Sequence, residues 1–228
     1  MAAKSKLTLG VDEAGRGPAI GPMVMAVVAL DTRAAATLTR KGLTDSKAFG
    51  AGDDAHAVRC ELAAEIRARA TFIAHIEVEH DEIDARVVRN ELNVLEREVA
   101  VRLIDQAPRC DRIIADGARM FAPLCGRYPH LVSKDRAESH HAAVAAASVI
   151  AKVRRDERWH QIRARYEPEL GPIAGGGYGN AATRRWLRAY VERYGRLPDE
   201  ARRSWPYPYV ADLIGDTRLP GPQGELFA

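Results

Sequence analysis

Cysteine is scarce in this chain of 228 residues. Cys60, Cys110 and Cys125 show none of the paired spacings that bind zinc, and three thiols cannot all form disulfides within one chain. The sequence therefore gives no sign of a disulfide framework. We expect a cytoplasmic protein, in a reducing compartment, whose thiols are buried or idle.

Long apolar runs are also missing. No stretch reaches the length of a membrane span or of the apolar core of a signal peptide, so we expect no membrane partner. A strong excess of one charge is missing too, because 34 basic residues stand against 31 acidic ones. This balance permits a nucleic-acid partner without requiring one, so local patches must decide.

The overall composition is that of a soluble globular protein, with 46% hydrophobic and 29% charged residues. We predict one folded domain over residues 1–214, large enough for a well-buried core. From Gly215 onward proline, glycine and polar residues dominate, which predicts a flexible tail over residues 215–228.

Two adjacent acids end the first apolar run. Residues 7–11 alternate as a buried strand does, and Asp12 and Glu13 follow directly. Two carboxylates in such a place are costly unless a cation neutralises them, and a divalent metal is the usual solution. In the turn that follows, Gly15 and Gly17 allow close backbone approach, and Arg16 offers a planar fork of donors suited to phosphate. The combination indicates phosphodiester chemistry.

A third acid has a similar setting. Residues 111–116 form an apolar strand that ends in Asp116, followed by a glycine. If this strand lies beside the first, Asp116 faces Asp12 across a metal site. Read alone, an aspartate before a glycine is also an ordinary turn. The early glycines do not form a nucleotide-hydrolase phosphate loop, because the required lysine followed by serine or threonine is absent.

The order Asp-Glu-Ala-Gly-Arg-Gly-Pro from residue 12 resembles the opening of the type 2 ribonucleases H, the ribonuclease HII group. Asp-Ser-Lys at residues 45–47 and Gly-Tyr-Gly at residues 177–179 are similar to further signatures of that family. The similarity runs from about Leu7 to about Trp205. It implies an α/β protein with the ribonuclease H-like fold, a mixed five-stranded sheet flanked by helices, with a helical C-terminal region.

The fourth acid departs from the ribonuclease HII pattern. That family has an aspartate ten residues before the serine that corresponds to Ser148, and Glu138 stands at this position here. The sister ribonuclease HIII group has a glutamate as its fourth acid. We therefore assign Glu138 as the fourth carboxylate, with Asp135 as the alternative.

The resemblance implies an endonuclease that hydrolyses the RNA strand of RNA/DNA hybrids and cuts at ribonucleotides embedded in duplex DNA. It implies two Mg²⁺ or Mn²⁺ ions and products with 5′-phosphate and 3′-hydroxyl ends. The expected metal-binding and catalytic residues are Asp12, Glu13, Asp116 and Glu138, and the expected substrate-binding residues are Gly15, Arg16, Gly17, Lys47 and Tyr178. Two alternatives stay open: a ribonuclease HIII-like enzyme that prefers longer hybrids without junction specificity, and a catalytically silent hybrid-binding module.

The last residues carry a second short motif. Gln223, Leu226 and Phe227 resemble the segment by which bacterial replication and repair enzymes dock into the sliding clamp. An unstructured tether with two apolar anchors suits such a contact, although a plain frayed end is the alternative. The motif implies work in DNA replication or ribonucleotide excision repair.

Periodicity predicts the secondary structure and two charged surfaces. The expected strands are residues 7–13, 23–30, 71–79, 111–116 and 130–134, and the expected helices are 34–70 with a break near 50–54, 91–107, 140–165 and 181–194. We interpret residues 154–158 as a solvated charged face. We also expect Trp186 and Trp205 to be interleaved with arginines on a basic surface formed by residues 181–194 and 202–205.

Overall fold

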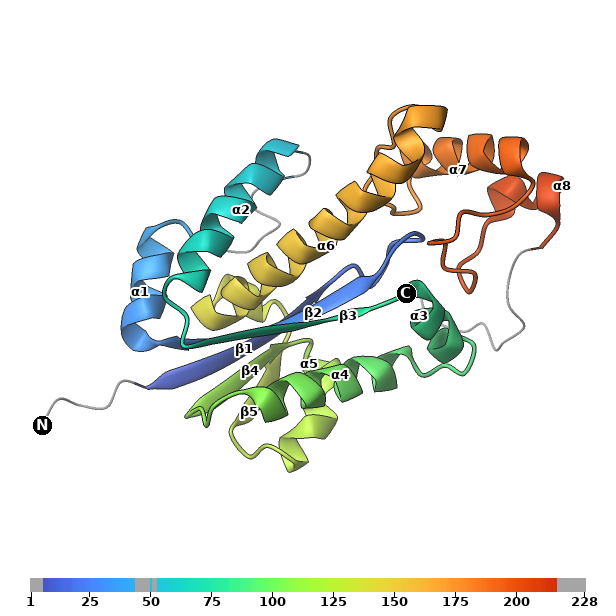
Figure 1. Ribbon diagram of the computed structural model, residues 1–228. Helices are drawn as coiled ribbons and strands as arrows, with labels where there is room; N and C mark the ends of the chain where they lie inside the picture. The colour runs from blue at the N-terminus through green and yellow to red at the C-terminus, as the bar shows by residue number, and fades with distance from the viewer. Residues whose placement is uncertain (1–5, 44–49, 51–52, 217–228) are drawn as a thin grey trace, which may run out of the picture. The chain divides into compact units, whose positions relative to one another are not determined.

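Five strands form one mixed sheet in the computed structural model, which describes residues 6–43, 50 and 53–216 (Figure 1). The strands are β1 (Leu7–Ala14), β2 (Met23–Asp31), β3 (Phe72–Val78), β4 (Arg112–Asp116) and β5 (Leu131–Lys134). Their order across the sheet is β3-β2-β1-β4-β5. β1 is antiparallel to β2 and parallel to β4, and β4 is parallel to β5. The predicted mixed five-stranded sheet is confirmed.

Eight α-helices accompany the sheet in the described part of the chain. They are α1 (Thr32–Arg40), α2 (Asp53–Arg67), α3 (His80–Val87), α4 (Leu92–Gln106), α5 (Ala118–Phe121), α6 (Ala142–Leu170), α7 (Ala181–Tyr194) and α8 (Ala211–Ile214). The bounds of α7 agree with the prediction, and α6 runs further than expected, through Pro168. None of the described helices combines the length and apolarity needed to cross a membrane.

Contacts divide the chain into two compact units. The first contains residues 1–14, 24–77 and 96–154, and the second contains residues 15–23, 78–95 and 155–228. The sheet belongs to the first unit apart from the end residues Met23 and Val78. The boundary falls directly after β1, and it also divides α4 and α6.

In the first unit, one face of the sheet packs against α1, α2 and α6. Val24, Ala26, Val28 and Leu30 alternate along β2 and join one buried cluster with residues of these helices, while Figure 1 shows α4 on the other side. Gly10 shows how closely α6 approaches, since a Cβ built on it would lie 2.1 Å from the carbonyl carbon of Ala143. The small residues in the first half of α6 allow this close approach to the sheet.

The pleat of β1 determines which side chains share this face, which we name the α6 face. Successive side chains of a strand point to opposite faces. Because Gly10 meets α6 and Ala14 belongs to the same buried cluster, Asp12 between them also lies on the α6 face. Glu13 then lies on the opposite face.

The second unit contains two loops that pack on each other. The turn after β1, residues 15–22, packs against the glycine loop of residues 175–179. The Ala19 amide of the turn donates a hydrogen bond to the Gly177 carbonyl of the loop at 2.8 Å. The glycine loop ends at Asn180, whose side chain caps α7 by accepting from the Thr183 amide at 3.1 Å. Asparagine is among the residues most strongly preferred as a helix N-cap.

Candidate active site

Asp12 and Asp116 lie at the ends of two neighbouring parallel strands. The register pairs Gly10 with Ile114 and Val11 with Ala115, so the next residues along β1 and β4 are the two aspartates. Ile114 packs with Val144 of α6, and alternation places Asp116 on the same face as Ile114. Neighbouring strands are about 5 Å apart, so the two carboxylates are close neighbours on the α6 face.

Burial and repulsion act together on Asp12. Its residue is only 6% exposed. Burial, and to a smaller degree the charges of Asp116 and Glu138, together raise the pKa of Asp12 to about 7. A hydrogen bond with the Ser148 side chain and one from the Glu13 amide, at 2.8 Å to Oδ1, oppose this rise in pKa. The carboxylate is therefore held in place by polar partners while its charge is uncompensated by any of them.

Glu138 reaches the same site from a short 3₁₀ helix, Ala137–Ser139, and is 3% exposed. The Ala137 amide donates to Asp116 Oδ1 at 2.9 Å, which ties this helix to the end of β4. Arg136 enters the helix with a left-handed φ of 55°, an uncommon conformation for a side chain of its size. These features direct Glu138 toward the aspartate pair.

Asp135, the alternative fourth acid, has a different surrounding. It is exposed, and its Oδ1 accepts from the Ala118 amide at 2.7 Å, at the start of α5. That hydrogen bond supplies an acceptor for one of the amides that a helix start leaves without an intrahelical partner. The charge of Glu138 thus acts on Asp12, whereas Asp135 lies at a helix start.

The remaining predicted site residues separate by position. Glu13 is half-buried and lies on the face opposite Asp12, so the contact it makes with Asp12 is through its backbone amide. Lys47 and the motif residues Gln223, Leu226 and Phe227 lie outside the described residues.

The donor set suits a hard divalent cation completed by a ligand. Over the described ranges, no group of three or more His, Cys, Asp or Glu side chains is arranged to hold a metal ion as it stands. Magnesium, however, is commonly bound through one or two carboxylates together with waters and substrate phosphates. The buried carboxylate of Asp12 and the half-buried one of Asp116 fit such an ion, because its charge offsets both the burial and the repulsion that raise the Asp12 pKa.

In the second unit, the predicted substrate residues Gly15, Arg16, Gly17 and Tyr178 lie together. Gly15 has a φ of 86°, and a Cβ on Gly17 would lie 3.9 Å from the Tyr178 ring. Tyr178 is 43% exposed, and its inner face covers the guanidinium of Arg155 at 5.6 Å. Arg16 extends to Asn93, with 2.8 Å between Nη2 and Oδ1. The ring of Tyr178, from the glycine loop, thus lies beside the Gly17 backbone of the turn.

The prediction of a solvated charged face at residues 154–158 is wrong for two of its members. Arg155 is 2% exposed and Asp156 is 7% exposed. Arg155 donates to the Gly176 carbonyl and stacks on Trp159 at 5.5 Å. A signal was present in the sequence, because Arg155 follows Ala151 and precedes Trp159 by four residues each, on the buried stripe of the helix.

The predicted basic surface is also wrong in its aromatic members. Trp186 and Trp205 are buried, at 5% and 6% exposure, and Arg202 is buried as well. Arg188 pairs with Asp212 at 2.7 Å, so part of the positive charge of α7 is already neutralised. Helical spacing places Trp186 with Tyr190 on the packed side of α7.

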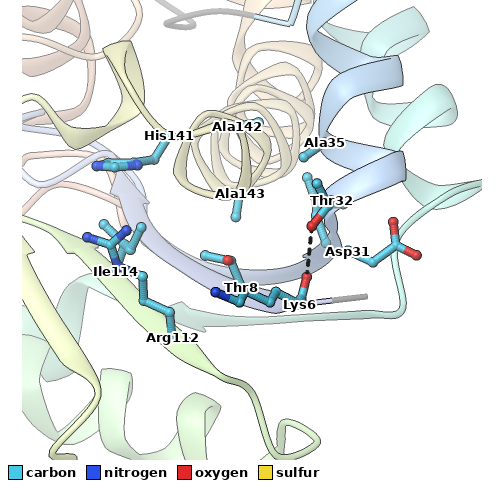
Figure 2. Close-up of a pocket in the computed structure, with 11 residues that line it drawn as sticks. Lys6, Thr8, Asp31, Thr32, Ala35, Arg112, Ile114, His141, Ala142 and Ala143 are labelled. Atoms are coloured by element: carbon cyan, nitrogen blue, oxygen red, sulfur yellow. Dashed lines mark hydrogen bonds between the residues drawn. The ribbon is translucent and has the colours of Figure 1, made fainter. Parts of the chain in front are cut away.

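A cavity of about 130 Å³ lies at the opposite end of the strands (Figure 2). Thr8 and Arg112, near the starts of β1 and β4, line it together with His141 and Lys6. The acids stand four residues further along each strand, roughly 13 Å away at about 3.3 Å per residue. The cavity is smaller than the roughly 300–1,000 Å³ of typical small-molecule sites, and it is separate from the acids.

Comparison with known proteins gives consistent results. A family model described as Ribonuclease HII matches residues 9–207. Ribonuclease HII of Pyrococcus furiosus is 32% identical over 205 residues, covering 86% of this chain and 87% of that protein. The crystal structure of ribonuclease H2 from Pyrococcus horikoshii OT3 superposes with a TM-score of 0.77 at 27% identity, covering 92% of this chain and 98% of that one.

Two further similar solved structures are complexes, one with a protein and one with a metal ion. The PCNA:RNase HII complex from Archaeoglobus fulgidus has a TM-score of 0.71 at 29% identity, covering 87% of this chain and 93% of that one. Bst ribonuclease HIII in complex with Mn²⁺ has a TM-score of 0.72, covering 95% of this chain and 72% of that one. Its identity of 22% supports a shared fold alone.

Replacing Asp12 with asparagine should stabilise the metal-free protein at neutral pH. A carboxyl whose pKa is raised from 3.8 to about 7 on folding contributes stability that is complete below pH 4 and lost as pH rises through 7. Asp12→Asn escapes this loss, which amounts to at most about 4 kcal/mol because one pKa unit is worth about 1.4 kcal/mol.

Urea unfolding with a chelator, at pH 4.5 and pH 8, measures the difference. The variant should gain stability over wild type at pH 8 and little at pH 4.5, while Glu61→Gln, a change at an exposed acid of α2, should shift neither. Equal stability of Asp12→Asn and wild type at pH 8 would contradict the electrostatic account.

Proposed function

Because this chain belongs to the ribonuclease HII family and is a ribonuclease H, we propose that it cuts duplex DNA at single embedded ribonucleotides as well as the RNA strand of hybrids. The products would be 5′-phosphate and 3′-hydroxyl ends. The observation that supports the proposal is the buried Asp12 carboxyl, whose pKa is raised by burial and by the nearby charges of Asp116 and Glu138.

Asp12, Asp116 and Glu138 would hold two divalent ions, magnesium or manganese; the latter occurs in the name of the similarly folded ribonuclease HIII complex. When bound, such ions lower the pKa of an attacking water and stabilise the leaving 3′ oxygen. Ser148 and the Glu13 amide orient the Asp12 carboxylate, and the Ala137 amide orients that of Asp116. The protein therefore fixes the directions of its acidic oxygens before any substrate arrives.

The turn of residues 15–17 would read the sugar. A ribonucleotide differs from a deoxyribonucleotide at one site only by its 2′-hydroxyl, which both donates and accepts hydrogen bonds. The amides of the turn and the Arg16 guanidinium are donors for that hydroxyl and the adjacent phosphate. Tyr178, with its exposed ring 3.9 Å from the Gly17 position, would pack against the neighbouring deoxyribose.

A second candidate function is a ribonuclease HIII-like preference for longer hybrids. The glutamate at position 138 is the feature that favours it, since the resemblance assigns an aspartate there to ribonuclease HII. The intact Gly15-Arg16-Gly17 turn and Tyr178 favour recognition of a single ribonucleotide.

A two-substrate cleavage assay decides between these functions. One duplex carries a single ribonucleotide in DNA, the other a continuous RNA strand paired with DNA, and each is tested with Mg²⁺ and with Mn²⁺. We expect cleavage of both duplexes, including a cut at the single ribonucleotide. Absence of cleavage at the single ribonucleotide, with intact cleavage of the continuous hybrid, would refute the junction reading.

Substitutions of the acids test the assignment of the site. Glu138→Gln should lower kcat by at least about 100-fold, because removing a metal-binding carboxylate removes charge stabilisation of the transition state. Asp135→Asn, three residues away, should lower stability slightly by weakening the bond to Ala118 and leave kcat within about threefold. The opposite ranking would make Asp135 the fourth acid.

The last residues of the sequence would bind a sliding clamp. The similarity to a ribonuclease HII that forms a complex with PCNA supports such a partner, and Gln223, Leu226 and Phe227 supply the motif. A chain ending at residue 222 should lose clamp affinity at least about tenfold in a binding titration while keeping its cleavage rate on a short duplex. Unchanged affinity would remove the proposal.

A further inference from the structure

Arg202 is a completely buried cation of the second unit, with 0% exposure. Its guanidinium donates to three carbonyls of the turn: Nε to Gly21 at 2.9 Å, Nη1 to Arg16 at 2.6 Å, and Nη2 to Gly15 at 2.5 Å. One face of its planar group covers the Trp205 ring at 5.0 Å. A single side chain therefore grips the turn that carries the Gly-Arg-Gly motif at three points.

The charge of Arg202 persists despite its burial. Burial, with the nearby cation Arg155 adding to it, lowers the pKa of Arg202 to about 10, so the guanidinium stays protonated at neutral pH. A buried cation is costly unless its donors are satisfied, and here carbonyl oxygens satisfy them. The buried guanidinium of Arg202 holds the turn in place through these carbonyls.

The three hydrogen bonds fix the direction of the turn's amides. In a planar trans peptide, the carbonyl and the N–H point in opposite directions. The Gly15 carbonyl shares its peptide with the Arg16 amide, and the Arg16 carbonyl shares its peptide with the Gly17 amide. Because Arg202 draws both carbonyls toward itself, both amides point away from it. Gly17 is exposed, and the ring of Tyr178 lies beside it.

The segment that carries Arg202 is itself anchored. The Arg202 amide donates to the Ala19 carbonyl at 2.8 Å. The carboxylate of Asp84, in α3, accepts from the amides of Arg203 at 2.7 Å and Ser204 at 2.9 Å. Arg202 is thus held both at its backbone and at its guanidinium. The direction of the Arg16 and Gly17 amides is therefore fixed in the free protein.

We propose that Arg202 is the positioning residue for ribonucleotide selectivity: by clamping the carbonyls of Gly15 and Arg16, it aims the Arg16 and Gly17 amides at the 2′-hydroxyl. This inference rests on the proposed recognition of a ribonucleotide by the turn. It assigns to a buried residue outside the Gly-Arg-Gly motif the orientation of the groups that read the sugar.

Lysine is the informative replacement. It keeps a positive charge of similar reach, but its ammonium is a point charge and lacks the planar fork that spans three carbonyls. Arg202→Lys should therefore preserve the local charge and release at least one peptide of the turn. Selectivity should fall while general affinity for the polyanionic duplex remains.

The experiment measures binding in an Asp12→Asn background, which prevents cleavage. Fluorescence anisotropy gives the dissociation constants for a duplex with one ribonucleotide and for the all-DNA duplex of the same sequence. Adding Arg202→Lys should lower the preference for the ribonucleotide at least about fivefold, the loss of roughly one hydrogen bond, with all-DNA binding within about twofold. Val191→Ala, which opens a buried position of α7 away from the turn, should lower stability and leave the preference unchanged.

The outcomes separate the two levels of the argument. A background protein with no preference for the ribonucleotide would remove the proposed function on which the inference rests. A preference that survives Arg202→Lys, or an equal weakening toward both duplexes, would overturn the positioning role alone.

Should Arg202→Lys fail to fold, Asp84→Asn, which loosens the segment that carries Arg202, takes its place in the same binding assay. The preference for the ribonucleotide should fall while all-DNA binding stays within about twofold. An unchanged preference would overturn the positioning role.

Discussion

Repulsion between carboxylates at the ends of β1 and β4 is the constraint on which the site depends. Parallel pairing brings Asp12 and Asp116 into adjacent register positions on one face, and Glu138 adds a third negative charge. Burial strengthens this repulsion because the interior screens charge poorly. Holding these oxygens close lowers the stability of the folded protein, and the binding of a divalent cation offsets that loss.

The surroundings of the acids keep them ordered without neutralising them. Asp12 is held by Ser148 and by the amide of Glu13, and Asp116 is held by the amide of Ala137. Each partner is a neutral donor, which orients an oxygen but leaves its charge available. A lysine or arginine in such a place would have satisfied the carboxylate and competed with a metal ion.

The second unit solves the inverse problem, since it buries cations. Arg155 lies close enough to Arg202 to lower the pKa of Arg202. Carbonyl oxygens accept hydrogen bonds from both guanidinium groups, and tryptophan rings pack against them. This arrangement gives the glycine turn a positively charged support, which suits a polyanionic substrate. At Gly15, where the turn begins, a Cβ would lie 2.8 Å from the Pro22 carbonyl oxygen and φ is 86°, so glycine is required there.

The sequence by itself predicted the five strands and the α7 helix, because these depend on periodicity, and its resemblance to the ribonuclease HII group supplied the acids and the glycine turn. It also narrowed the fourth acid to Glu138 or Asp135. Only the tertiary structure gave these two acids their different surroundings. Glu138 follows Arg136, which has a left-handed φ, and its charge acts on Asp12, whereas Asp135 accepts a hydrogen bond at the start of α5. Tertiary structure likewise buried Arg155, Arg202 and Trp205, whose partners are up to 188 residues away along the chain. For Arg202, charge and spacing cannot reveal this burial, because a guanidinium looks solvated until three distant carbonyls are brought to it.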